Sequence, residues 1–174
     1  MRLKFVAGLL AAPLAFFALT AMSYRADFFS INFPDGWTAP EKTPDGLYVT
    51  KSLDGAVNCN ASSVVSPDYA GKTHQELNEA LPGMTLEDWA DHFAVPASQI
   101  TVKDDEKRHV GDLWLHVATF TVAPGGSIPQ QTMFRYALVL SPGRINMAGC
   151  YAAAADFPAY AAIFEAVVSS LRPL

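Results

Sequence analysis

Residues 131–171, QTMFRYALVLSPGRINMAGCYAAAADFPAYAAIFEAVVSSL, decide the fold. Residues 131–140 are apolar on both alternating faces, as in a strand at the centre of a sheet. The Ser-Pro-Gly sequence at 141–143 has turn chemistry, and residues 144–152 have the pattern of a returning strand. This segment therefore predicts an antiparallel hairpin.

A helix is predicted directly after this hairpin. Asp156 stands where its carboxylate can cap the helix, and Arg172 and Pro173 mark the end. The apolar positions between them recur at helical spacing: Phe157, Tyr160, Ala161, Phe164, Val167, Val168 and Leu171. Because these side chains form one apolar stripe, we expect the helix to lie on the sheet that contains the hairpin.

Strand-like alternation recurs in the preceding sequence. The predicted strands span residues 29–33, 47–52, 56–65, 99–110 and 113–123. A two-residue turn at 111–112 joins the last two, which places His109 opposite Trp114. That register puts Lys107 and His116 on the same face as this pair.

Two short helices are predicted within residues 73–93. Thr73 with Glu76, and Thr85 with Asp88, have the spacing of capping boxes. Each helix has a single apolar side, so the two helices are expected to cover one face of the sheet while the terminal helix covers the other. The predicted fold is α+β, a mainly antiparallel sheet of about six to seven strands with helices on both faces, an α/β/α sandwich.

The first residues have the layout of a secretory signal peptide. Basic residues precede an apolar run over residues 5–21, and small residues follow. Residues 1–23 are the predicted signal peptide, cut after Ser23 or, as second choice, after Ala21, and a retained membrane anchor is the alternative. Removing 23 of the 174 residues leaves 151, which fits a single α/β domain over 24–174 in the periplasm or secreted.

The charge balance restricts the partners. Arg2 and Lys4 leave with the signal peptide, so ten of the 12 Lys and Arg residues remain against 17 Asp and Glu, a net charge of −7. Nucleic acids and anionic membrane surfaces attract positive patches. The composition thus disfavours both kinds of partner, and no membrane span is expected once the signal peptide is removed.

Both cysteines of the chain, Cys59 and Cys150, lie in predicted strands. In an exported chain, such a pair is by default a disulfide. A free buried pair and a reactive thiol are the alternatives. No CxxC motif is present, so redox-motif, haem-attachment and zinc-finger interpretations lack support.

Packing and turn features extend over nearly the whole mature chain. They are an opening strand that runs into 33–37 (FPDGW), a middle helix with Trp89, and a last strand that leads through Asp156 and Phe157 to a helix ending at 169–172 (SSLR). With these features the chain resembles the PsbP-like superfamily, named for an extrinsic subunit of the photosynthetic oxygen-evolving complex. The resemblance implies this fold and a partner-binding or accessory role without a reaction, and no feature of the chain supports photosystem binding.

The histidines are candidates for chemistry. His74 and His92 are predicted to be solvated, and His116 to be a neutral imidazole bonded to a neighbour. A nucleophile needs a converging base and an orienting group. Cys150 with His116 as its base is the nearest combination, but Cys150 has no activating charge nearby in the sequence, so this interpretation is disfavoured.

An acidic run gives the strongest metal-site candidate. Asp104, Asp105, Glu106 and His109 supply oxygen and imidazole donors close together. Strand alternation places Asp104 and Glu106 on the face opposite Asp105 and His109, which separates the ligands. We therefore expect neither a metal nor another cofactor.

One strand face carries a polar patch. Asn58, Asn60 and Ser62 share that face, and the predicted hairpin brings Tyr48 and Lys51 near them. These residues could form a recognition surface or a solvated face, and the solvated interpretation is preferred.

The function predicted from these observations is that of an exported, non-enzymatic binding or accessory protein whose partner is another protein of the cell envelope. One alternative is a small metal-dependent or hydrolytic enzyme with a site built from scattered residues. The other, suggested by the acidic charge, is an envelope inhibitor or an immunity-type protein.

Overall fold

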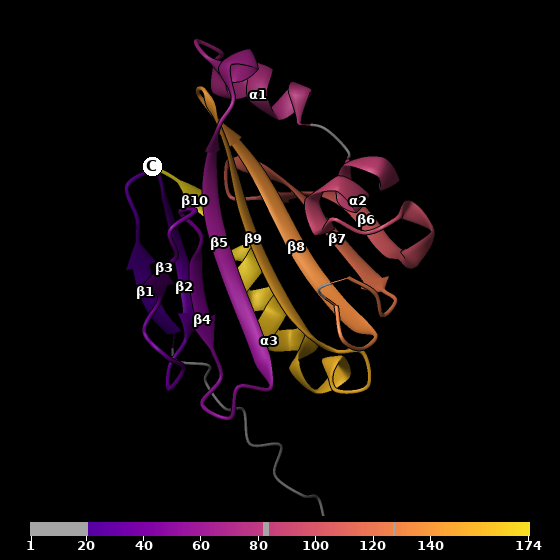
Figure 1. Cartoon of the computed structure of the whole chain (residues 1–174). Coiled ribbons are helices and arrows are strands. Elements are labelled where there is room, and N and C mark those ends of the chain that lie inside the picture. Colours follow the sequence, from indigo (N-terminus) through magenta and orange to yellow (C-terminus); the bar gives the residue numbers. More distant parts are fainter. Residues whose placement is uncertain (1–20, 82–83, 127) are drawn as a thin grey trace, which may run out of the picture.

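The computed structural model describes residues 21–81, 84–126 and 128–174 (Figure 1). Residues 1–20 of the predicted signal peptide lie outside this part. The last three residues of the predicted signal peptide, 21–23, belong to strand β1 (Ala21–Arg25). The predicted cut after Ser23 would therefore fall inside that strand.

The main sheet has seven strands, and all neighbours are antiparallel. Their order across the sheet is β3 (Glu41–Lys42), β4 (Tyr48–Lys51), β5 (Val57–Val65), β9 (Arg144–Ala153), β8 (Thr132–Ser141), β7 (Leu113–Val122) and β6 (Ile100–Val110). The predicted hairpin is β8–β9, and it occupies the centre of the sheet, as its two apolar faces require. The predicted α+β fold is confirmed.

A second, smaller sheet was not predicted. It has the order β1–β2–β10, with β2 at Phe29–Pro34 and β10 at Arg172–Pro173. The sequence pattern placed the opening strand in the main sheet. Instead, β2 pairs with β1 on one side and with β10 on the other, and these two strands come from the two ends of the described chain. Phe29, Ile31 and Phe33 still point into the main core.

Helices cover both faces of the main sheet, as predicted. The helix α3 (Phe157–Ser169) lies behind the sheet in Figure 1, whereas α1 (His74–Ala80) and α2 (Leu86–Phe93) pack on the other face. Both short helices begin with the predicted capping boxes. Short 3-10 turns precede α1 and follow α2, at Pro67–Tyr69 and Ala97–Gln99.

The helix α3 begins where it was predicted to begin, but the predicted capping by the Asp156 carboxylate is not observed. Asp156 occupies the N-cap position, but its side chain makes no capping hydrogen bond. The backbone of Asp156 is already helical, with φ −91° and ψ −23°. An N-cap residue whose side chain caps the helix usually has an extended backbone instead. The helix is instead held by apolar burial, since Phe157, Phe164 and Val168 lie in the core against the sheet.

Cys59 and Cys150 form a disulfide, as predicted. They stand directly opposite each other on β5 and β9, and both are fully buried on the α3 face. The bond joins residues 91 positions apart. It therefore fixes the long-range β5–β9 pairing on which the main sheet depends.

Candidate functional site

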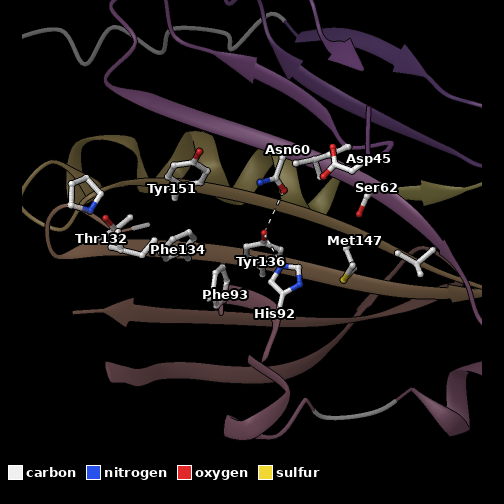
Figure 2. A pocket seen from close by; sticks show the side chains of 14 residues that line it. Asp45, Asn60, Ser62, His92, Phe93, Thr132, Phe134, Tyr136, Met147 and Tyr151 are labelled. Carbon is white, nitrogen blue, oxygen red and sulfur yellow. Dashed lines mark hydrogen bonds between the residues drawn. The ribbon is translucent and has the colours of Figure 1, made fainter. Parts of the chain in front are cut away.

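The face opposite α3 is only partly covered, because α2 packs over β7 and β8 and leaves β5 and part of β9 uncovered. A groove of about 740 Å³ lies there (Figure 2). Its lining residues are Asp45, Leu47, Asn60, Ser62, Val64, His92, Phe93, Ile128, Pro129, Thr132, Phe134, Tyr136, Met147 and Tyr151. The volume lies in the range of small-molecule and peptide sites.

Aromatic rings form the floor of the groove. The ring of Phe93 lies 4.8 Å from that of Phe134, whose centroid is 5.2 Å from that of Tyr151. Beside them on β7, Phe120 stacks on Phe134 and packs against Trp89. These mutual contacts hold the rings in place, so the floor is a preformed apolar surface.

Tyr136 links the two walls of the groove by hydrogen bonds. Its Oη lies 3.3 Å from His92 Nε2 on α2 and donates to Asn60 Oδ1 on β5 at 3.4 Å. Figure 2 shows these three side chains converging across the floor. Tyr136 donates its only proton to Asn60. The hydrogen bond between His92 and Tyr136 is therefore donated by Nε2–H of His92 and accepted by the Tyr136 hydroxyl oxygen.

Burial favours the neutral forms of these groups. It raises the pKa of Tyr136 to about 12 despite the bond to Asn60, and it lowers the pKa of His92. The pKa of Tyr151 is raised by the same cause. Near pH 7 the groove thus offers neutral hydrogen-bonding groups above an aromatic floor.

The groove continues along α2 into a second hollow of about 460 Å³. The two hollows share Val64, His92 and Met147, and the second adds Met84, Asp88, Asp91, Leu138 and Ile145. Neither hollow is lined by a Lys or Arg of the described residues. The carboxylates in the lining of the two hollows, Asp45, Asp88 and Asp91, are therefore not paired with a basic residue of the lining.

The predicted polar patch is split by the structure. Asn60 and Ser62 line the groove and are half-buried there. Asn58 lies outside it. Tyr48 is buried on the α3 face, because it pairs with Ala61, whose side chain points there.

The surroundings of His74, His92 and His116 agree with the predictions. His74 is exposed, as predicted. His92 is also exposed, as predicted, although one side of its ring packs on Tyr136. His116 is buried and bonded to Asp105, as expected of an imidazole held by a neighbour.

The acidic run alternates between faces as predicted. On the α3 face, Asp104 accepts a hydrogen bond from Arg135. On the other face Asp105 bonds His116, and His109 packs on Trp114 with centroids 5.1 Å apart. Among the described residues, no group of three or more His, Cys, Asp and Glu side chains is arranged to hold a metal ion.

The Cys150–His116 combination is excluded as a nucleophile and base. Cys150 is oxidised in the disulfide and faces α3. His116 lies on the opposite face of the sheet, beside Asp105 of β6. The sheet itself separates the two side chains.

The groove residues missed by the sequence patterns are His92, Phe93, Tyr136 and Tyr151. A usable signal was present at two of them. Tyr136 and Tyr151 are tyrosines in the two central strands, where a buried hydroxyl such as that of Tyr136 needs a partner.

The architecture and this partly covered sheet define a PsbP-like α+β fold. The structure matches that of the PsbP protein CyanoP from the cyanobacterium Synechocystis with a TM-score of 0.59 and 14% identity, over 96% of this chain and 100% of that one. It also matches the Ran-binding protein Mog1p of Saccharomyces cerevisiae, with a TM-score of 0.56 and 8% identity, over 89% and 96% of the two chains. These similarities show a shared fold.

At the level of sequence, a scan against protein-family models and a search of curated proteins found no match. Within the described ranges, no helix combines the length and apolarity needed to cross a membrane.

Proposed function

We propose that this chain is an exported, non-enzymatic binding or accessory protein of the cell envelope, and that the groove between β5 and α2 receives part of its partner. The groove carries the proposal, because it is large, preformed and lined by neutral hydrogen-bonding groups over an aromatic floor. The Cys59–Cys150 disulfide supports an oxidising compartment outside the cytoplasm.

The chemistry of the groove favours binding over catalysis. General acid–base catalysis works best when the pKa of the catalytic group lies near the working pH. Tyr136, with a pKa raised to about 12, holds its proton at neutral pH and serves as a hydrogen-bond donor. Its partners Asn60 and His92 fix the ring, as in a recognition surface built before the ligand arrives.

A protein partner is also consistent with the fold comparison. Mog1p, which shares the fold, is described as a Ran-binding protein. A fold can host unrelated functions, so the likeness supports the class of function and no particular partner.

Two matched variants test the groove. Asn58 and Asn60 lie on the same face of β5, two positions apart, but only Asn60 lines the groove. Asn60→Phe should fill the groove, whereas Asn58→Phe adds the same side chain outside it. Native mass spectrometry of protein purified after export, together with cross-linking in intact cells, should show a ligand or partner retained by the wild type and by Asn58→Phe and lost from Asn60→Phe.

The melting temperatures of both variants show whether any loss reflects unfolding. Equal retention by a folded Asn60→Phe variant would place binding elsewhere. Turnover of a substrate that is abolished by one substitution in the folded protein would contradict the non-enzymatic role.

A further inference from the structure

The groove and its extension form one elongated trough. Lining residues advance along β8 from Thr132 through Tyr136 to Leu138, and along β9 from Tyr151 to Ile145. At the usual rise of about 3.3 Å per residue, the span on β8 is about 20 Å. That length matches about six extended residues of a peptide and exceeds what a compact small molecule needs.

The floor of the trough is mainly apolar, and the Tyr136 hydroxyl is a polar group within it. Its first part is aromatic, with Phe93 and Phe134, and its second part is aliphatic, with Leu138 and Ile145. Met147 lies where the two parts join. Methionine side chains adapt to differently shaped apolar partners. The floor thus suits a row of apolar side chains.

Among the described residues, the charged side chains on the walls of the trough are acidic. Asp45 lines the first hollow on the side of β4, and Asp88 and Asp91 of α2 line the second hollow on the opposite wall. Asp88 is held in place by the capping box, in which it accepts a hydrogen bond from the backbone N–H of Thr85 at 2.7 Å. Desolvation lowers the pKa of His92 on α2, which favours its neutral form. Carboxylates on both walls favour a cationic occupant.

Resting on the proposed function, we infer that the occupant is a short segment of a partner protein in which apolar side chains are flanked by Lys or Arg. The apolar side chains lie along the trough between Thr132 and Leu138. The basic groups reach Asp45 on one wall and Asp91 on the other. The net charge of −5 of the whole chain adds a long-range attraction to such a segment.

Three fluorescently labelled synthetic peptides test this inference by fluorescence anisotropy. The first has an apolar centre with Lys flanks, the second the same centre with Glu flanks, and the third Lys flanks with a serine centre. The first peptide should bind, and the other two should bind at least about tenfold more weakly, because each lacks one of the two interactions.

Matched carboxylate variants locate the charge effect. Asp91→Asn should weaken binding of the first peptide by about two- to fivefold and reduce its salt dependence, as expected for removal of one exposed ion pair. Glu87→Gln makes the same charge change on α2 outside the trough and should leave binding unchanged. Asn60→Phe should abolish binding, whereas Asn58→Phe should not.

Several outcomes would overturn the inference. Equal binding of the Lys- and Glu-flanked peptides removes the charge selectivity. Equal binding of the serine-centred peptide, or insensitivity to Asn60→Phe, indicates charge attraction outside the trough. Absence of peptide binding, while native mass spectrometry still finds another ligand that Asn60→Phe excludes, rejects the peptide and leaves the proposed function standing. Absence of both rejects both.

Discussion

Tyr136 on β8 lies flat over Gly149, its directly paired neighbour on β9. A Cβ added at residue 149 would overlap the Tyr136 ring. Glycine at this position is thus what allows the tyrosine to reach Asn60 and His92 from the floor of the groove.

Gly149→Ala is therefore predicted to destabilise the protein by about 1–3 kcal/mol, the usual cost of overpacking. Urea denaturation measures the change. The cost should shrink strongly when Gly149→Ala is made together with Tyr136→Ala, because the clashing ring is then absent. An equal cost in both backgrounds would mean that the strain lies in the backbone of β9.

Loss of the disulfide is predicted to destabilise the fold by up to about 4–5 kcal/mol in the chain-entropy model, because the bond closes a loop of about 90 residues. The comparison is between the wild type and the Cys59→Ala, Cys150→Ala double variant in urea. A reducing agent should lower the stability of the wild type and leave the double variant unaffected. Two titratable thiols in the exported wild type, with an unchanged melting curve for the variant, would contradict the prediction.

Alkaline pH is predicted to lower the free energy of unfolding of the protein through the ionisation of Tyr136 in the groove. The pKa of Tyr136 is about 12 in the folded state against an ordinary value of 10.0, so the folded state holds the proton more tightly. The resulting stability is complete below pH 10 and is lost as pH rises from about 10 to about 12. Its size is about 2–3 kcal/mol, at 1.36 kcal/mol for each pKa unit.

Tyr136→Phe isolates this contribution, since Tyr151 also has a raised pKa and adds a similar slope. Between pH 10 and pH 12 the free energy of unfolding of Tyr136→Phe should fall less steeply than that of the wild type. Parallel curves would show that Tyr136 ionises as freely in the folded chain as in the unfolded one. Both proteins are best compared in the cysteine-free background, where alkaline cleavage of the disulfide plays no part.

An ion-pair network on the α3 face predicts acid sensitivity. Arg135 is buried and donates to Glu165 of α3 and Asp104 of β6, each at 2.8 Å. Burial acts to raise the pKa of Glu165, but hydrogen bonds from Ser169 and Arg135 and the nearby arginine charges outweigh it and leave that pKa lowered. This contribution to stability is present above the unfolded-state pKa of Glu165 and is lost as pH falls through the folded-state value.

Glu165→Gln should therefore lower stability by about 0.5–1 kcal/mol at neutral pH, a modest value because the carboxylate is partly exposed. The difference from the wild type should vanish in acid, where Glu165 is protonated. Glu87→Gln, at an exposed carboxylate of α2, is the control for the loss of one surface charge. A difference that persists in acid would point to packing rather than charge.

Export predicts a defined N-terminus. The mature protein should begin at Tyr24, or at Met22 if the second site is used, and its intact mass should be two hydrogens below that of the reduced chain. N-terminal sequencing of protein recovered from the periplasm checks the cut. A full-length chain in the membrane fraction would support the retained anchor instead.

Local patterns in the sequence were sufficient for most of the secondary structure. The β8–β9 hairpin, α3 and the capping boxes at Thr73 and Thr85 all depend on interactions within a few residues, so their spacing is visible in the sequence. Alternation likewise separated Asp104 from Asp105 onto opposite faces of β6. The two cysteines predicted a bridge because export leaves few other fates for such a pair.

The groove and the second sheet were decided by tertiary structure alone. Asn60, His92 and Tyr136 come from three elements, and they meet only because β5 pairs with β9 and α2 packs beside them. Likewise, β2 joins β10 because α3 returns the chain to that place. Periodicity specifies which side of an element is buried but not which distant element it meets, since that choice depends on the packing of the whole chain.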